Sequence, residues 1–217
     1  MASHRSFTSR SIQQTTNTVL TAPSGLANDD ILILAWSCEA DVTPTPPSGF
    51  AQLIDIDHAS VANDLFVWWK RAASESGSYT VTHSLSWTEA YLVAVQSAST
   101  TADPTVGSGN SGTGTTTTAL GVTPAGNDAW IGFMASMRND GGASTPPSGS
   151  TPTFDERYNP GNSFYAADGT LATAGATGNK TITTNTTDWM AVLVVVEDAT
   201  PPAPNWTIRY DYQVELT

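Results

Sequence analysis

The chain has 217 residues, and its 20 acidic and eight basic side chains give a formal net charge of −12 at pH 7. An acidic surface repels phosphate backbones, so we expect no nucleic-acid partner. The single cysteine, Cys38, excludes an internal disulfide, and its apolar neighbours make it a core side chain. Thr and aromatic residues favour strands, while Gly and Pro interrupt them, so the composition predicts an all-β chain.

We expect residues 1–14 to form an N-terminal arm. Its first ten residues, MASHRSFTSR, contain two arginines and no acid, although the chain as a whole is acidic. Two interpretations stay open, because chain ends are often only solvated. The alternative is an arm that docks on an acidic partner. The side chains that would bind this partner are Arg5, Phe7 and Arg10.

Alternating or short apolar runs bounded by turn residues predict twelve strands, and no segment predicts a helix. The runs 31–36 and 190–196 are apolar at consecutive positions, which is typical of central strands covered on both faces. The first six strands are expected at residues 12–20, 30–39, 50–56, 64–72, 78–83 and 88–97. The other six are expected at residues 115–122, 128–138, 152–158, 163–173, 179–185 and 189–197.

The sequence repeats itself, which indicates an internal duplication. TPPSG occurs at residues 45–49 and again at 145–149, and the apolar runs on either side recur in the same order. The half-repeats span about residues 12–99 and 113–200, and the Gly/Ser/Thr-rich stretch 107–118 is expected to be a linker or crossover.

Six strands per half could form two small tandem domains or one double sheet. We favour a single antiparallel β-sandwich of jelly-roll type with internal pseudo-duplication over residues 15–200. Each half alone is short, has no disulfide and would leave open strand edges that the other half could cover.

Residues 201–217 form a C-terminal tail with the clearest pattern in the chain. After the stiff spacer PPAP, apolar and polar residues alternate strictly, which predicts one long amphipathic strand. This strand either closes its own sheet or adds to a neighbouring subunit. The apolar positions expected to bind a partner are Trp206, Ile208, Tyr210, Tyr212 and Val214.

The search for catalytic chemistry gives no site. The three histidines lie in no motif for nucleophilic catalysis, and no spacing typical of a zinc, phosphate or dinucleotide site occurs, so neither a metal nor a cofactor is expected. Asp55 and Asp57, with His58 beside them, could form a carboxylate pair, but solvent-facing acids on a strand explain them better.

The seven tryptophans offer a different possibility, because an exposed indole ring can stack on a sugar. The neighbours Trp68 and Trp69 must point to opposite faces of a strand, so one of them should be less buried. They are the candidate glycan-binding residues, with core packing as the alternative.

The motifs TPPSGFAQL, VWWKRAASESGSYTVT, TPPSGSTPTFDERY and ATAGATGNKTITT follow one another in this order. As an ordered set they resemble a family of β-sandwich domains found in virion proteins of tailed bacteriophages and in some bacterial surface proteins. The resemblance covers about residues 15–198 and implies a structural or attachment role without catalytic residues.

These observations together predict a non-enzymatic virion protein, a capsid decoration (cement) protein that binds the outer surface of a phage head. Its partners would be the major capsid protein and further copies of itself, with a homotrimer expected by analogy with other decoration proteins. The chain lacks both a long apolar stretch and a signal peptide, so we expect synthesis in the host cytoplasm and no membrane partner. The alternative function is a tail-fibre or host-attachment module that binds surface glycans.

Overall fold

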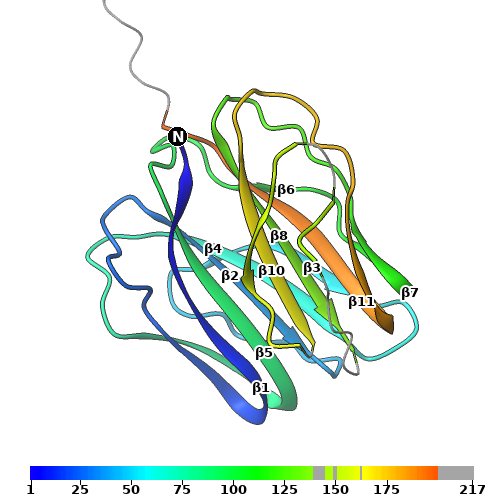
Figure 1. Ribbon diagram of the computed structural model, residues 1–217. Coiled ribbons are helices and arrows are strands. Elements are labelled where there is room, and N and C mark those ends of the chain that lie inside the picture. The colour runs from blue at the N-terminus through cyan, green and yellow to red at the C-terminus, as the bar shows by residue number, and fades with distance from the viewer. Residues whose placement is uncertain (139–144, 149–150, 162, 200–217) are drawn as a thin grey trace, which may run out of the picture.

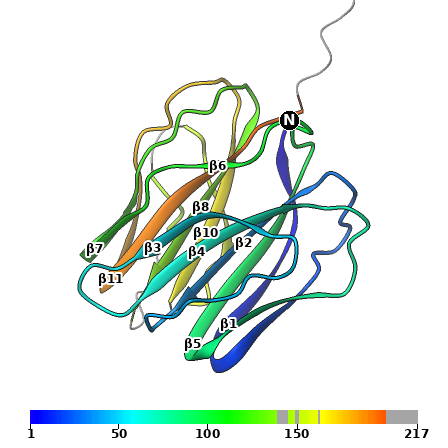
Figure 2. The same cartoon turned by 180° about the vertical axis from the view of Figure 1, so that it is seen from behind.

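The computed structural model describes residues 1–138, 145–148, 151–161 and 163–199. It is an antiparallel β-sandwich of two packed sheets, without a helix in these ranges and therefore without a helix that could cross a membrane (Figure 1). The N-terminus lies at one end of the sandwich, as the reverse view also shows (Figure 2).

The first half of the chain forms a five-stranded sheet with the order β1-β5-β2-β4-β3. Its outer strands are therefore β1 and β3, and the fully buried β2 lies at its centre. The bounds are β1 Ser3–Thr21, β2 Ile31–Cys38, β3 Ala51–Asp57, β4 Asp64–Arg71 and β5 Ser78–Gln96.

The second half forms the other sheet, with the order β6-β11-β8-β10-β9 and with β7 also paired to β11. The order β7-β11-β8-β10-β9 repeats that of the first sheet, so the two halves have the same architecture and the duplication is confirmed. The bounds are β6 Thr105–Val106, β7 Asn110–Ala119, β8 Ala129–Met137, β9 Asp155–Tyr158, β10 Phe164–Leu171 and β11 Lys180–Val196.

The fold class, an all-β antiparallel sandwich with two similar halves, is confirmed. Each half supplies one complete sheet, so the connections between strands stay within a sheet, whereas successive strands of a jelly roll pass between the two sheets. The jelly-roll expectation therefore holds for the two antiparallel layers and not for the order of connections.

The longest strands bend at equivalent places in the two halves. In the first half, Thr16 on β1 faces the three residues 83–85 of β5, because the register shifts between Thr15 and Asn17. In the second half, residue 115 of β7 faces residues 184–186 of β11 in the same way. These bulges bend the strands without ending them. The predicted strand pairs 78–83 with 88–97 and 179–185 with 189–197 are therefore single strands, β5 and β11.

Three apolar clusters hold the sandwich together. The central cluster lies between the sheets and includes Ile33, Val93, Met134 and Val194. Each sheet also buries its other face against its own bent hairpin and loops, around Trp36 in the first half and in a separate cluster in the second. Strands β2 and β8 are buried on both faces, which explains their uninterrupted apolar sequences.

Two expected segments differ from the structure. The stretch 107–118 is not a linker, since most of it belongs to β7, which pairs with β11. The residues expected to form an arm, 1–14, lie from Ser3 onward in β1 and pair with β5.

The free cysteine Cys38 is buried, and burial raises the pKa of its thiol to about 12.

Candidate functional site

Arg5 contributes to the internal structure of the first sheet. Its guanidinium group binds both carboxylate oxygens of the buried Asp30, with Nε at 2.6 Å from Oδ2 and Nη2 at 3.1 Å from Oδ1. Asp30 also accepts a hydrogen bond of 2.9 Å from the backbone amide of Ala27. The Arg5 charge is therefore neutralised within the protein.

Phe7 and Arg10 lie further along β1 and nearer to solvent. The Phe7 ring is 37% exposed and lies 5.3 Å from the ring of Tyr91, at the rim of the central cluster. Arg10 is half-buried and hydrogen-bonds the side-chain oxygen of Gln13. These two side chains are accessible to a partner from the outer side of β1.

The two tryptophans proposed for glycan stacking are both in contact with the protein interior. Trp68 is only 1% exposed, and its ring stacks on Phe66 with a centroid distance of 5.3 Å. Trp69 is half-buried against the central cluster. Trp68 thus offers no ring face to a sugar, and Trp69 offers part of one.

The tail positions expected to bind a partner lie outside the described residues. They are Trp206, Ile208, Tyr210, Tyr212 and Val214.

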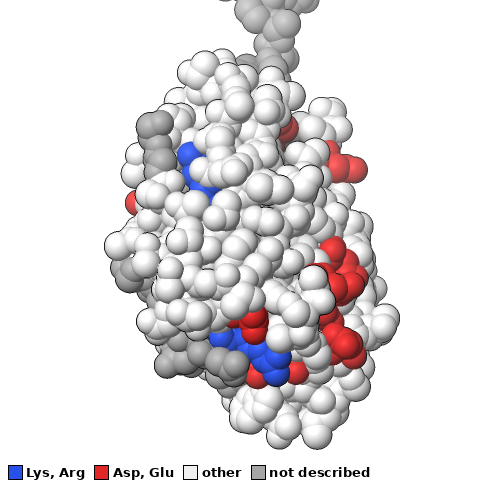
Figure 3. Space-filling model, turned by 90° about the vertical axis from the view of Figure 1, so that its right-hand side faces the viewer, with Lys and Arg blue, Asp and Glu red and all other residues white. Residues whose placement is uncertain are grey.

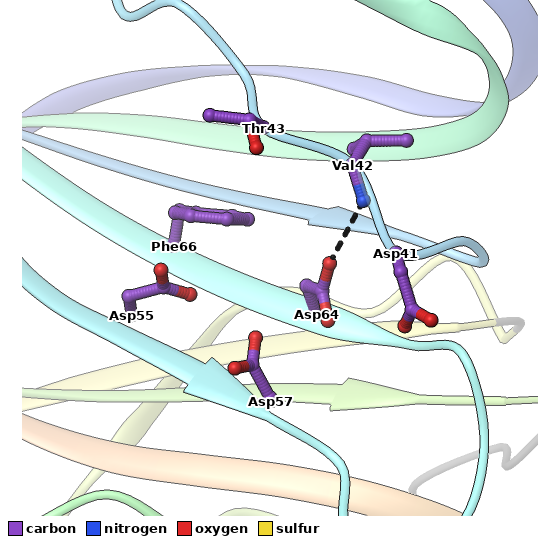
Figure 4. A pocket seen from close by; sticks show the side chains of 7 residues that line it. All are labelled: Asp41, Val42, Thr43, Asp55, Asp57, Asp64 and Phe66. Carbon is purple, nitrogen blue, oxygen red and sulfur yellow. Dashed lines mark hydrogen bonds between the residues drawn. The ribbon is translucent and has the colours of Figure 1, made fainter.

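Four aspartates surround a surface pocket of about 490 Å³ at the end of the first sheet (Figure 4). Asp55 and Asp57 come from β3, Asp64 comes from β4 and Asp41 comes from the loop after β2. Asp57 and Asp64 face each other directly in the β3–β4 pairing. The Asp64 carboxylate accepts a hydrogen bond of 3.3 Å from the backbone amide of Val42.

The crowded carboxylates hold protons more tightly than isolated ones. The pKa of Asp64 is raised to about 7, mainly by burial, and the neighbouring charges of Asp57 and Asp41 act in the same direction. Burial and Asp57 also raise the pKa of Asp55. Near neutral pH, the Asp64 carboxyl group can therefore hold a proton beside the facing Asp57 side chain.

His58, which follows this acidic strand, lies next to Asp41 in a separate, smaller surface depression. Its Nε2 lies 3.1 Å from the carbonyl oxygen of Gly112, so it hydrogen-bonds the second sheet. In the described ranges, no group of three or more His, Cys, Asp and Glu side chains is arranged to hold a metal ion. The acidic pocket can bind protons, and it brings Asp55 and Asp57 together with two acids that sequence analysis did not select.

A pair of exposed apolar side chains on β5 forms a different kind of site. Leu85 is 63% exposed and Trp87 is 46% exposed, and both lie at the bend of the β1–β5 hairpin. Trp87 faces Gln14 of β1. The exposed indole of the first half is therefore Trp87, and neither Trp68 nor Trp69 is exposed to this extent.

The second half has polar residues at both equivalent positions. The matched bulges align Leu85 with Thr186 and Trp87 with Asp188. Since both halves form the same bend, apolar residues are not needed to make it. The pair could not be singled out from the sequence, because residues 84–87 lie in the expected gap between the strands 78–83 and 88–97.

The charged side chains are sparse on the face shown in Figure 3, where acidic groups gather along one side and most of the surface is uncharged. Comparison of the chain with protein-family models, with curated proteins and with solved structures gives no match.

Proposed function

We propose that this protein is a capsid decoration protein, which binds the outer surface of a phage head and stabilises it by binding and not by catalysis. The observation that supports this most directly is the exposed pair Leu85 and Trp87 at the bend of β5. The ordered motifs that resemble phage virion domains support a capsid as the partner surface.

The exposed pair has the properties of a protein-binding surface. Burying a leucine and a tryptophan side chain at an interface contributes about 2 kcal/mol each, and tryptophan is among the residues that most often dominate binding energy. The hairpin bend holds both side chains on a rigid strand, so little conformational entropy is lost on binding. The second half has polar residues at both equivalent positions, so the part of the chain that the structure describes presents this pair once.

The test is co-sedimentation of the purified protein with mature, undecorated phage heads at moderate salt. We expect saturation at a ratio that fits the capsid symmetry. Replacing the pair by its second-half equivalents, Leu85→Thr with Trp87→Asp, should weaken binding about a thousandfold, because two contributions of about 2 kcal/mol are lost together.

The matched control is Val19→Thr, which also removes an exposed apolar side chain from the same hairpin. In the register of the repeat, Val19 corresponds to Thr118, so this change also copies the second half. The control should bind heads like the original protein. Equal binding by the double variant and the original protein would refute the role of the pair.

A host-attachment module that binds glycans is the second candidate, and the exposed Trp87 indole is the observation that favours it. Sugar stacking needs the aromatic ring but not the neighbouring leucine. In this case Trp87→Asp alone should abolish binding to host envelope, while Leu85→Thr should have no effect. Binding to envelope and not to heads would select this second function.

A further inference from the structure

The outer edge of β1 is a second surface available for pairing. β1 is the first strand of its sheet, and β5 is the only strand to which Ser3–Thr21 is paired within the described ranges. Unpaired backbone groups along a sheet edge can accept a further strand from another chain. At 19 residues, β1 shares with β5 the greatest strand length in the structure.

Bulges reduce the usable part of this edge to short regular segments. The register of β1 shifts between His4 and Ser6 and again between Arg10 and Gln13, and it is regular from Ser6 to Arg10. This regular segment spans about 17 Å at 3.4 Å per residue. It is long enough for an added strand to form several backbone hydrogen bonds.

The two faces of this segment differ in chemistry. The Phe7 side chain points to the central cluster, and its ring stays partly exposed at the rim of that cluster. Thr8 lies on the opposite face, where its hydroxyl donates a hydrogen bond of 2.7 Å to the carbonyl oxygen of Thr21. Arg10 lies on the same face as Thr8, because side chains alternate along a strand. Ser3–Thr21 contains no acidic residue.

The sequence of the C-terminal tail complements both faces. Its even-numbered residues from 206 to 216 are apolar, and its charged odd-numbered residues are Arg209 and the two acids Asp211 and Glu215. Residues directly opposite each other in paired strands lie on the same face. A register that places an aromatic residue such as Tyr210 opposite Phe7 therefore also places the polar residues, including the two acids, on the face of Arg10.

The point at which the described chain ends favours a neighbouring molecule as the acceptor. The Asp198 carboxylate lies 2.7 Å from the terminal amine of Met1, so the described chain ends beside the start of β1 (Figure 1). The spacer 201–204 has the sequence Pro-Pro-Ala-Pro, which favours an extended and stiff segment over a tight turn back onto its own molecule.

We propose that residues 205–216 of one copy add as a strand to Ser6–Arg10 of β1 in a second copy. This pairing covers the Phe7 ring with aromatic side chains and places the polar residues of the tail, with two acids and one arginine, on the face of Arg10. It does not depend on the capsid as partner, because both strands belong to this chain.

The test is the mass of the full-length protein in solution, measured by sedimentation velocity. The original protein should be an oligomer, and Tyr210→Pro should be a monomer because proline lacks the amide that donates to the ladder. The matched control Tyr210→Phe should remain an oligomer. Unchanged far-ultraviolet circular dichroism would show that Tyr210→Pro remains folded. A monomeric original protein, or an oligomer of Tyr210→Pro, would overturn the proposal.

A mixing experiment separates exchange between copies from pairing within one copy. The variant Phe7→Asp with Arg10→Glu has a defective acceptor edge and an intact tail, whereas Tyr210→Pro has the reverse. Each should be monomeric alone, and their mixture should form a dimer because one intact tail meets one intact edge. A mixture that stays monomeric would overturn pairing between copies. The variant Leu85→Thr with Trp87→Asp should keep the mass of the original protein, so loss of head binding and loss of oligomers can be told apart.

Discussion

Glu89 on β5 accepts a hydrogen bond of 2.8 Å from the hydroxyl group of Tyr158 on β9, and this contact joins the two sheets. Glu89 is 1% exposed and accepts a second hydrogen bond of 2.8 Å from the Ser163 hydroxyl. Its equivalent in the second half is the buried Met190, so the carboxylate is not required by the repeated architecture. Burial is the main reason why the pKa of Glu89 is raised.

Tyr158→Phe should destabilise the protein by about 1 to 3 kcal/mol, because it removes one of two donors from a buried carboxyl group. The measurement is the free energy of unfolding in urea. The matched control is Tyr91→Phe, because the buried Tyr91 hydroxyl has no hydrogen-bond partner among the described residues. The control should be neutral or slightly stabilising. If both variants lost the same stability, the inter-sheet hydrogen bond would not be the cause.

Asp64→Asn should stabilise the protein above neutral pH by about 1 kcal/mol, because it removes one charge from two acids that face each other. The folded-state pKa of Asp64, about 7, lies above its ordinary value of 3.8. The folded protein therefore binds the proton more tightly than the unfolded chain. The stability from this proton is fully present below pH 4 and is lost as the pH rises through about 7.

The measurement is the unfolding midpoint of both proteins from pH 4 to pH 9. The original protein should lose stability between pH 4 and about 7, and the variant should lose less over the same range. Glu89, whose pKa is also raised, contributes a slope of the same sign in both proteins. Parallel curves would show that Asp64 does not take up the proton.

Most of the fold could be predicted from the sequence, since buried runs such as 31–36 and the turns around them carry clear patterns. The bends in the long strands could not be predicted, because residues 83–87 contain polar residues although this segment covers one edge of a core. The first part of β7, residues 110–114, was missed because its Ser-, Thr- and Gly-rich sequence buries no side chain fully, and its strand conformation depends on pairing with β11. Tertiary pairing determines such edge strands more than local composition does.

The choice of candidate site residues depended on which side chains are exposed, and the sequence predicts side-chain exposure less well than it predicts the positions of strands. Adjacent tryptophans predict opposite faces, but in this sandwich both faces of β4 are covered, which leaves Trp68 buried. Asp64 was not grouped with Asp57 because the pairing of β3 with β4 was needed to place them opposite each other.

Arg5→Ala should destabilise the protein by about 2 to 4 kcal/mol, because it leaves the buried Asp30 carboxylate without its cation. Arg10→Ala removes a charge from the same strand but leaves no buried partner behind, so its unfolding free energy should change by less than about 0.5 kcal/mol. The free energies of unfolding of the two variants in urea compare the internal role of Arg5 with the surface role of Arg10. If Arg5→Ala were as stable as Arg10→Ala, the ion pair with Asp30 would not support the sheet.

The outer cores of the two halves contain a tryptophan on different strands. In the first half, Trp36 lies on β2 and Thr88 lies on β5, and both side chains hydrogen-bond the Thr18 hydroxyl. The equivalent positions of the second half hold Ala135 and Trp189, so the large side chain lies on the neighbouring strand in that half.

Trp36→Ala should cost about 3 to 5 kcal/mol, because it opens a large cavity in the outer core of the first half. Adding Thr88→Trp recreates the arrangement of the second half and should recover at least about 1 kcal/mol, although Thr88→Trp alone should be destabilising through overpacking. Urea unfolding of the two single variants and the double variant measures this coupling. If the two losses of stability were additive, the indole at position 88 would not fill the space left by Trp36. The two halves would then share their strand order but could not exchange the position of the tryptophan in their outer cores.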